Sequence, residues 1–384
     1  MTVPPTAMPT PTPAVLTGVD VLLRDGLERL SAKRVGLITN ATGRTSDGRS
    51  TIDALHADSR WSLAALFSPE HGIRGEAQAG QSIDSRTDPA TGLPIHSLYG
   101  TTTRPTAQML QGLDALVYDI QDVGARTYTY ISTLLEVMRA ASQHSLPVVV
   151  LDRPNPIGGD HVDGNVLDTR FASFVGPAPI AMRYGMTLGE LAQRFNADVG
   201  ADLHVLRLVG WQRSMWFDQT DLEWVNPSPN IRSLSAAALY PGTVLFEGTN
   251  LSEGRGTPIP FEWFGAPWLN VDSLVALDLP GVRLTPVDHT PDAGADKYPG
   301  EVCHGLSIEV HDRQALQPMD LAVRLLAGLR GTRLQFNAAT FDALAGTDHL
   351  RQALQTNARV DDIIAAWQPH LANFQARRRQ YLLY

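Results

Sequence analysis

Five short apolar runs, separated by segments with helical spacing, constrain the fold of this 384-residue chain more than any other feature. The runs cover residues 34–40, 62–67, 115–122, 147–156 and 202–208. Apolar residues recur at helical spacing at 18–30, 50–58, 106–113, 127–145 and 187–197. Strands that alternate with helices are typical of a parallel sheet covered by helices. The sequence therefore predicts an α/β fold with a Rossmann-like parallel sheet.

A second, smaller domain of α/β or α+β type is predicted to follow. A chain of this length is expected to form two domains, because domains average roughly 100–200 residues. A tryptophan-rich passage at 209–232 is interpreted as the connection between them. Beyond it we predict a turn at Tyr240-Pro241-Gly242, a half-exposed strand at 305–310, and helices near 319–329, 348–356 and 360–378. The predicted boundaries are a disordered leader at 1–17, an N-terminal domain at 18–232 and a C-terminal domain at 233–384.

Composition and charge argue against a nucleic-acid partner, an intrachain disulfide and a membrane-spanning helix. The net charge is −9, and the only basic block is Arg377-Arg378-Arg379, which argues against a nucleic-acid partner. The single cysteine, Cys303, cannot form an intrachain disulfide. No apolar run approaches the roughly 20 residues of a membrane-spanning helix, and the Pro/Thr-rich start lacks the pattern of a secretory signal. We expect a cytoplasmic location for the chain as written, and export if the true start differs.

Polar side chains follow four of the predicted strands, at the point where each strand ends. They are Asn40; Glu70 and His71; Asp119, Gln121, Asp122 and Arg126; and Asp152, Arg153 and Asn155. The carboxyl ends of parallel strands meet at one edge of a sheet, and ligands bind beyond that edge. The four clusters therefore predict a binding or catalytic site there, although solvated loops are the alternative.

The densest of these clusters lies in the sequence ALFSPEHGIRGEAQAG, residues 65–80. Pro69 cannot donate to a strand ladder and should end the preceding strand. Glu70, His71 and Arg74 follow, interleaved with glycines that allow a close approach of the backbone to a ligand. A carboxylate, an imidazole and a guanidinium within five residues make this loop the first candidate for the site.

Several common catalytic motifs are missing from the sequence. The first strand is not followed by GxGxxG, and no GxxxxGK[ST] is present, so a nucleotide cofactor is not predicted. There is no HExxH, no Cys/His cluster and no GxSxG, so neither a zinc site nor a serine nucleophile is expected. Carboxylates remain as the chemical groups, and a pair of them is the usual equipment for glycoside hydrolysis. The candidates are Glu70, Asp119, Asp122, Glu247 and Glu253.

Tryptophans between the predicted domains fit a sugar ligand, because their faces can stack on sugar rings. Five of the seven lie close together in sequence: Trp211, Trp216, Trp224, Trp263 and Trp268. For each one taken singly, a place in the core between the domains is the favoured alternative.

Six motifs in order make the sequence resemble the NamZ (YbbC-like) exo-β-N-acetylmuramidase family from about Val19 to Tyr384. They are SPEHGIRG, YDIQDVGARTYTY, LDRPNPIGG with VDG, NPSPNI, YPGTVLFEGTNLSEGRGT and RRRQYLLY. The resemblance implies a Rossmann-like domain, a smaller C-terminal domain and an active cleft between them. It further implies release of N-acetylmuramic acid from the non-reducing end of peptidoglycan fragments, a reaction of cell-wall degradation and recycling. The implied partners are N-acetylmuramic acid–N-acetylglucosamine disaccharides and muropeptide glycans.

The resemblance places the catalytic glutamate of the SPEHG motif on Glu70. We expect Glu70 to act as general acid, with His71 orienting it. The second catalytic group stays open between Asp119, Asp122, Glu247 and the acetamido group of the substrate. The lactyl carboxylate of N-acetylmuramic acid calls for a guanidinium. The first choice is Arg74, which lies four residues from Glu70, followed by Arg126 and Arg183; Arg153 and Arg255 are the other candidates.

The remaining polar residues of the motifs are predicted to bind substrate. They are Asn40, Gln121, Tyr128, Asp152, Asn155, Tyr184, Asn230, Glu247, Asn250 and Glu253. Two alternatives stay open. A non-catalytic sugar-binding protein would keep the arginines and tryptophans without needing Glu70. A metal-dependent hydrolase would use His71, Asp119 and Asp122 as ligands and would lose activity in chelator.

Overall fold

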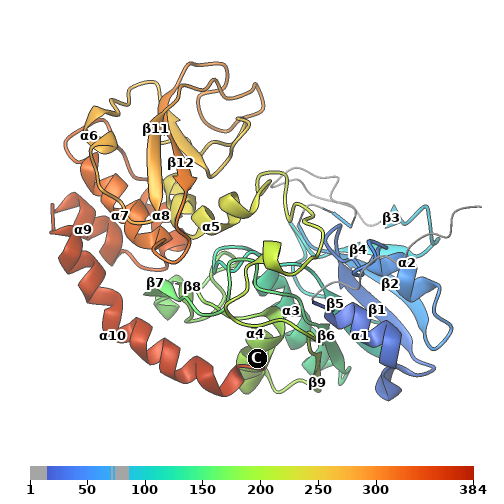
Figure 1. Ribbon diagram of the computed structural model, residues 1–384. Helices are drawn as coiled ribbons and strands as arrows, with labels where there is room; N and C mark the ends of the chain where they lie inside the picture. Colours follow the sequence, from blue (N-terminus) through green and yellow to red (C-terminus); the bar gives the residue numbers. More distant parts are fainter. Residues whose placement is uncertain (1–14, 71, 74–85) are drawn as a thin grey trace, which may run out of the picture.

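The computed structural model describes residues 15–70, 72–73 and 86–384, and its N-terminal part is built around one large sheet (Figure 1). The strands of this sheet are β1 (Arg34–Thr39), β2 (Ser62–Ser68), β3 (Arg86–Thr87), β4 (Pro94–Ser97), β5 (Ala115–Asp119), β6 (Val148–Leu151) and β9 (Leu203–Leu206). Their spatial order is β3-β4-β2-β1-β5-β6-β9, and only β3 pairs in the antiparallel direction. The six parallel strands have the Rossmann order, which reverses between β1 and β5. The predicted Rossmann-like α/β fold is confirmed.

Helices cover both faces of this sheet because alternate strand residues point to opposite sides. The helices are α1 (Gly18–Asp25), α2 (Thr51–His56), α3 (Tyr130–Gln143) and α4 (Leu188–Val199). Val35 and Leu37 of β1 share one apolar cluster with residues of α1 and α2. Ile38 belongs to a second cluster that contains the inward residues of α3 and α4. The loops that leave the strands are thereby held at one edge between two packed layers.

Two differences from the sequence predictions lie between residues 86 and 113. No strand was predicted at β4, a parallel strand in which only Ile95 is fully buried, so its apolar pattern was too weak to detect. The expected helix at 106–113 is a series of turns. Turns closed by the Leu110 N–H to Thr106 and the Leu113 N–H to Leu110 bury both leucines at the same spacing as one helix face would.

The C-terminal part combines a small antiparallel sheet with helices (Figure 1). Its elements are α5 (Leu234–Thr243), β10 (Trp263–Ala266), α6 (Asp272–Val275), β11 (Val282–Pro286), β12 (His304–Val310), α7 (Pro318–Gly328), α8 (Ala338–Ala345), α9 (His349–Gln355) and α10 (Val360–Arg378). The sheet order is β10-β12-β11. The strand predicted at 305–310 and the helices near 319–329, 348–356 and 360–378 are confirmed.

The turn predicted at Tyr240-Pro241-Gly242 is wrong, because these residues lie inside α5. Ala236 to Thr243 are all buried, and burial of this apolar segment outweighs the cost of a proline in a helix interior. Gly242 serves helix packing: a Cβ there would lie 1.9 Å from the Pro318 carbonyl oxygen of α7. Gly242 therefore marks a close approach of helices α5 and α7, not a turn of the chain.

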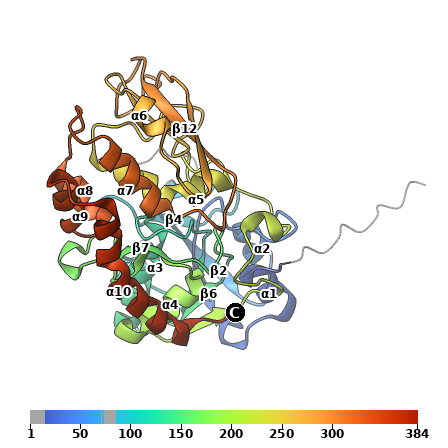
Figure 2. The ribbon, with the colours of Figure 1, turned by 60° about the vertical axis from the view of Figure 1, so that its left-hand side comes forward.

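The chain returns at its C-terminus to the first sheet (Figures 1 and 2). Helix α10 runs from the C-terminal part across a hairpin of β7 (Asp163–Val166) and β8 (Ala181–Arg183) toward α4. Arg378 Nη1 donates to the Gly159 carbonyl at 3.0 Å, and the Tyr384 hydroxyl donates to Asp152 at 2.8 Å. The RRRQYLLY motif therefore fastens the last helix to the N-terminal part.

Five short 3₁₀ turns complete the described secondary structure: η1 (Glu28–Leu30), η2 (Thr169–Phe171), η3 (Phe217–Gln219), η4 (Val244–Gly248) and η5 (Arg379–Tyr381). Within the described ranges, no helix has the length and apolar character needed to span a lipid bilayer.

Candidate active site

Glu70 lies two residues beyond the end of β2 and is half-buried at a small cavity of about 60 Å³. The Thr129 hydroxyl, at the start of α3, donates to Glu70 Oε2 at 2.9 Å. Residues of both predicted domains line the cavity: Glu70, Thr127, Tyr128, Thr129, Tyr130, Ser228, Ile231, Tyr240, Arg255 and Phe261. The glutamate predicted as general acid is therefore placed where the N-terminal and C-terminal parts meet.

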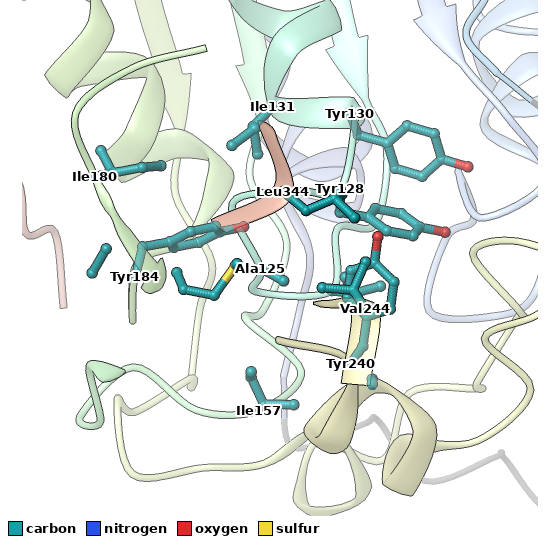
Figure 3. Packing of buried hydrophobic residues seen from close by; sticks show 14 of the residues in the cluster. Ala125, Tyr128, Tyr130, Ile131, Ile157, Ile180, Tyr184, Tyr240, Val244 and Leu344 are labelled. Carbon is teal, nitrogen blue, oxygen red and sulfur yellow. The ribbon is translucent and has the colours of Figure 1, made fainter. Parts of the chain in front are cut away.

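Four aromatic rings contribute to the cavity wall. Tyr128 packs edge-to-face against Tyr130, with ring centroids 4.9 Å apart, and against Tyr240 at 5.6 Å. Figure 3 shows these three rings side by side. Tyr240 in turn packs against Phe261 at 4.8 Å. Because rings locked in this way hold a fixed shape, the cavity is preorganised around Glu70.

Arg255 brings positive charge to the same cavity from the C-terminal part. Its Nη2 donates to Glu247 at 2.7 Å, its Nε lies 3.3 Å from Glu253, and its guanidinium covers the ring of Phe261. Lys297 completes the network at 3.0 Å from Glu253. Although burial acts in the opposite direction, the two carboxylates raise the pKa of Arg255, which stays charged. Burial also raises the pKa of Glu247, against the effect of Arg255.

The polar side chains at the end of β5 form hydrogen bonds with neighbouring loops of the protein. Asp119 is fully buried, and its two oxygens accept hydrogen bonds from Arg153 at 2.5 and 2.8 Å and from Thr51 at 2.5 Å. Gln121 donates to the carbonyls of Asp122 and Pro154. These contacts tie the loops after β5 and β6 to each other.

Asn40 is likewise engaged within its own loop after β1. Its side-chain oxygen accepts hydrogen bonds from the Thr42 N–H at 3.0 Å and from the Thr42 hydroxyl at 2.5 Å. The Thr42 hydroxyl also receives the backbone N–H of Gln121, at 2.9 Å. The loops on either side of the Rossmann reversal point are therefore joined directly.

Asp122 and Asp152 carry buried carboxyl groups that accept hydrogen bonds from neighbouring elements. The Tyr184 hydroxyl and the Gly124 N–H donate to one oxygen of Asp122, and burial raises the pKa of this carboxyl to about 6. Asp152 accepts from Thr187, Gly189 and Tyr384, and burial raises its pKa to about 7. Both groups brace neighbouring elements.

Asn155, which follows β6, also connects neighbouring segments through its side chain. Its amide donates to the Met186 carbonyl at 2.8 Å, and its side-chain oxygen accepts the Ile157 N–H at 3.2 Å. The residue thereby connects the loop after β6 to the segment that precedes α4.

Two of the predicted arginines are buried among backbone carbonyls. Arg126 donates to the carbonyls of Asn165, Ile180, Leu344 and Ala345, and it thereby connects α8 to the β7–β8 hairpin. Arg183 donates to Ile157 and lies against the ring of Trp216. Burial lowers the pKa of Arg126 to about 9 and that of Arg183 to about 10.

The other predicted site residues divide between the cavity region and the scaffold. Asn230 is half-buried between the cavity-lining Ser228 and Ile231. Asn250 is bonded to the backbone of Arg333 and Gln335. His71 and Arg74 fall outside the residues that the structure describes.

The five tryptophans between 211 and 268 occupy packed positions. Trp211 and Trp216 are buried near the C-terminal tail and Arg183, and Trp263 is fully buried within strand β10 of the small sheet. Trp224 packs edge-to-face on Phe217, and Trp268 donates to the Tyr298 hydroxyl. The described lining of the Glu70 cavity contains tyrosines and a phenylalanine in their place.

The sequence did not lead us to assign Tyr99, Thr129, Tyr130, Tyr240 or Phe261 to the site, although they surround Glu70 or line its cavity. The run TYTY at 127–130 carried the only usable signal, because alternate polar and aromatic residues stand at the predicted start of a helix. In the part of the chain that the structure describes, no three His, Cys, Asp or Glu side chains are grouped as a metal site requires.

Fold and cavity together show an α/β protein with a carboxyl group where its Rossmann-like part meets its C-terminal part. Family models for NamZ exo-β-N-acetylmuramidase match residues 35–235 with their N-terminal part and residues 238–384 with their C-terminal part. The chain belongs to the NamZ exo-β-N-acetylmuramidase family of glycoside hydrolases, as its motifs led us to expect.

Individual relatives agree with this assignment. The chain is 43% identical over 382 residues to the peptidoglycan β-N-acetylmuramidase NamZ of Bacillus subtilis, and the match covers 97% of this chain and 92% of that protein. Two crystal structures of DUF1343 family proteins from Bacteroides fragilis have the same fold. One has a TM-score of 0.90 at 35% identity and covers 97% of this chain and 99% of its own. The other has a TM-score of 0.79 at 30% identity, and the match covers 96% of this chain and 99% of that chain.

Proposed function

We propose that this chain hydrolyses the β-glycosidic bond of N-acetylmuramic acid at the non-reducing end of peptidoglycan fragments, with Glu70 as general acid. Membership of the NamZ family supports the reaction class. The observation that carries the residue assignment is the position of Glu70, which lines a cavity formed by both parts of the chain. Asp119 and Asp122, its competitors at and just beyond the end of β5, are instead bonded to Arg153 and Tyr184.

In the proposed reaction Glu70 donates its proton to the bridging oxygen between the two sugars. The bond from the anomeric carbon to that oxygen breaks, and its electron pair stays on the leaving oxygen. A water molecule adds to the anomeric carbon, and its released proton restores the acid. A positioned general acid contributes on the order of 10²–10⁴ to such a rate.

We further propose that Arg255 recognises the lactyl carboxylate, which is the only anionic feature that separates N-acetylmuramic acid from N-acetylglucosamine. Arg255 lines the Glu70 cavity, whereas Arg126 and Arg183 are buried and bonded to backbone carbonyls. The side chain of Arg153 is buried in its pair with Asp119 and is 6% exposed, whereas that of Arg255 is 24% exposed. A forked guanidinium held by Glu247 and Glu253 is fixed in orientation, which favours a planar carboxylate.

The test compares kcat/KM on paired aryl glycosides of N-acetylmuramic acid and N-acetylglucosamine, with and without chelator. The wild type should prefer the muramic substrate and should be unaffected by chelator. Arg255→Ala and Arg255→Lys should reduce the preference by roughly 30- to 150-fold, which corresponds to about 2–3 kcal/mol for a partly exposed charge pair. The ratio between two sugars does not depend on how much of a variant folds.

Asp25→Asn, which breaks an exposed ion pair with Arg24, is the control and should leave the preference unchanged. Equal rates on both sugars in the wild type would reject the muramidase proposal. Activity that disappears in chelator and returns with a divalent metal would favour a metal-dependent hydrolase. An unchanged preference in both Arg255 variants would reject the arginine assignment alone.

A further inference from the structure

Thr129 occupies the N-cap position of α3 but does not cap the helix. A threonine at this position ordinarily accepts a hydrogen bond from a backbone N–H of the first turn. Thr187 does so for α4, and Ser233 does so for α5, where it accepts the Ala236 N–H at 2.9 Å. The Thr129 hydroxyl makes no such bond, and it donates to Glu70 Oε2 instead. The side chain at this helix start is thus directed to the cavity.

A second hydroxyl reaches Glu70 from a different element. The phenol of Tyr99, two residues beyond β4, lies within hydrogen-bonding reach of the Glu70 carboxyl group. Burial, together with the charge of Glu70, raises the pKa of Tyr99 to about 12. The phenol therefore keeps its proton at neutral pH and stays a hydrogen-bond donor. Two donors thus approach the carboxyl group from the end of β4 and from the start of α3.

These contacts matter because the last torsion of a glutamate side chain is soft. Rotation about an sp³–sp² bond is broad, so a carboxyl group without fixed partners samples many orientations. Donors from two separate elements restrict that rotation. On the basis of the proposed function, we infer that Thr129, assisted by Tyr99, is a positioning residue that holds the Glu70 carboxyl group in the orientation needed for proton transfer to the leaving oxygen.

The two hydroxyls also have an electrostatic effect on the reaction. As the proton leaves Glu70, negative charge grows on its oxygens, and hydrogen bonds donated to that charge become stronger. Donors already in place when the charge appears require no reorganisation. Thr129 should therefore affect the chemical step and hence kcat, with little effect on KM. The effect should also depend on the leaving group, because a weakly basic phenolate departs with less help from an acid.

The experiment uses purified variants of the full chain and two substrates. The substrates are the natural disaccharide, which has a basic leaving oxygen, and an aryl glycoside with an acidic phenol. Thr129→Val removes the hydroxyl at nearly constant shape, and Thr129→Ser retains it. Ser132→Ala is the control, since the Ser132 hydroxyl lies on the same helix and donates to the Phe174 carbonyl away from Glu70.

We expect Thr129→Val to lower kcat on the disaccharide by roughly 10-fold or more, since a hydrogen bond to a charged group is worth about that factor or more. The loss on the aryl glycoside should be several times smaller, and KM should change little. Thr129→Ser should restore most of kcat, and Tyr99→Phe should show the same leaving-group pattern as Thr129→Val. Ser132→Ala should resemble the wild type on both substrates.

Equal losses of kcat on both substrates, or failure of the serine variant to restore it, would overturn the inference. A wild-type rate for Thr129→Val combined with an inactive Glu70→Gln would overturn the positioning role and leave the proposed function intact. A fully active Glu70→Gln would reject the general-acid assignment itself.

Discussion

Glu70 and Asp119 lie at the carboxyl ends of parallel strands of the same sheet: Glu70 is two residues beyond β2, and Asp119 is the last residue of β5. Asp119 is fully buried and accepts from Arg153 and Thr51. Glu70 is half-buried and lines a cavity whose opposite wall comes from the C-terminal part. Both residues therefore lie at strand ends, and their surroundings differ. Asp119 holds neighbouring loops together, whereas Glu70 faces a cavity that can admit a ligand.

The same division extends over the whole carboxyl edge of the sheet. Asp119 and Arg153 form a buried ion pair, while Asp122 and Asp152 are held by hydroxyl and backbone donors. These groups connect the strand-end loops to one another and to the C-terminal tail. Such a rigid set of loops supports precise placement of the residue that does face the cavity. The comparison predicts that substitutions of the buried Asp119, Asp122, Asp152 and Arg153 change stability, whereas substitutions at the cavity change activity.

The largest stability effect should come from Asp119→Asn. The substitution keeps the size of the side chain but leaves the buried Arg153 guanidinium without its counter-charge. Removing one partner of a buried pair costs about 3–5 kcal/mol. Chemical denaturation of the purified variant measures this loss directly.

Glu309→Gln is the matched control for that measurement, because it breaks the exposed pair with Arg283. An exposed pair contributes at most about 1 kcal/mol. Equal stability losses in the two variants would show that Asp119 does not brace the loops.

A smaller effect concerns the pH dependence of stability. Burial raises the pKa of Asp122 to about 6, from an ordinary value of 3.8. Between these two values the folded protein binds more protons at this site than the unfolded chain does. The contribution of Asp122 is therefore fully present below about pH 4 and is lost as the pH rises to about 6.

Asp122→Asn should consequently flatten the fall in unfolding free energy between pH 4 and pH 6, by up to about 1.4 kcal/mol per pH unit. Denaturation curves at several pH values, with the exposed Asp278→Asn as control, measure this slope. An unchanged slope in Asp122→Asn would mean that Asp122 is ionised in the folded protein throughout this range.

Part of this molecule is predictable from sequence because local patterns encode it. The apolar runs and helical spacings locate most of the Rossmann-like sheet and its helices, and Pro69 marks the point where β2 gives way to the Glu70 loop. Strand β4 escaped detection because its four residues bury only one side chain completely. The proline and glycine of α5 suggested a turn, although tertiary packing against α7 keeps the segment helical.

The candidate site was harder to predict for a physical reason. A polar residue at a strand end looks the same in sequence whether it faces a ligand or a neighbouring loop. The Arg153–Asp119 pair and the Arg126 contacts to α8 depend on residues far apart in the chain. Thr129 meets Glu70 across 59 residues of the N-terminal part, and Tyr240 and Phe261 line the same cavity only because the two parts of the chain fold together. Local periodicity carries no information about such contacts.

The most direct test of the account compares Glu70→Gln with Asp122→Asn on the natural disaccharide, after circular dichroism confirms that both variants are folded. Glu70→Gln keeps the shape of the side chain and removes the transferable proton, so its kcat should fall on the order of 10²–10⁴-fold. Asp122→Asn retains an acceptor for Tyr184 and should keep kcat within a few-fold of the wild type. A folded Glu70→Gln with a near wild-type rate, or an Asp122→Asn variant with the larger loss, would contradict the assignment of catalysis to Glu70.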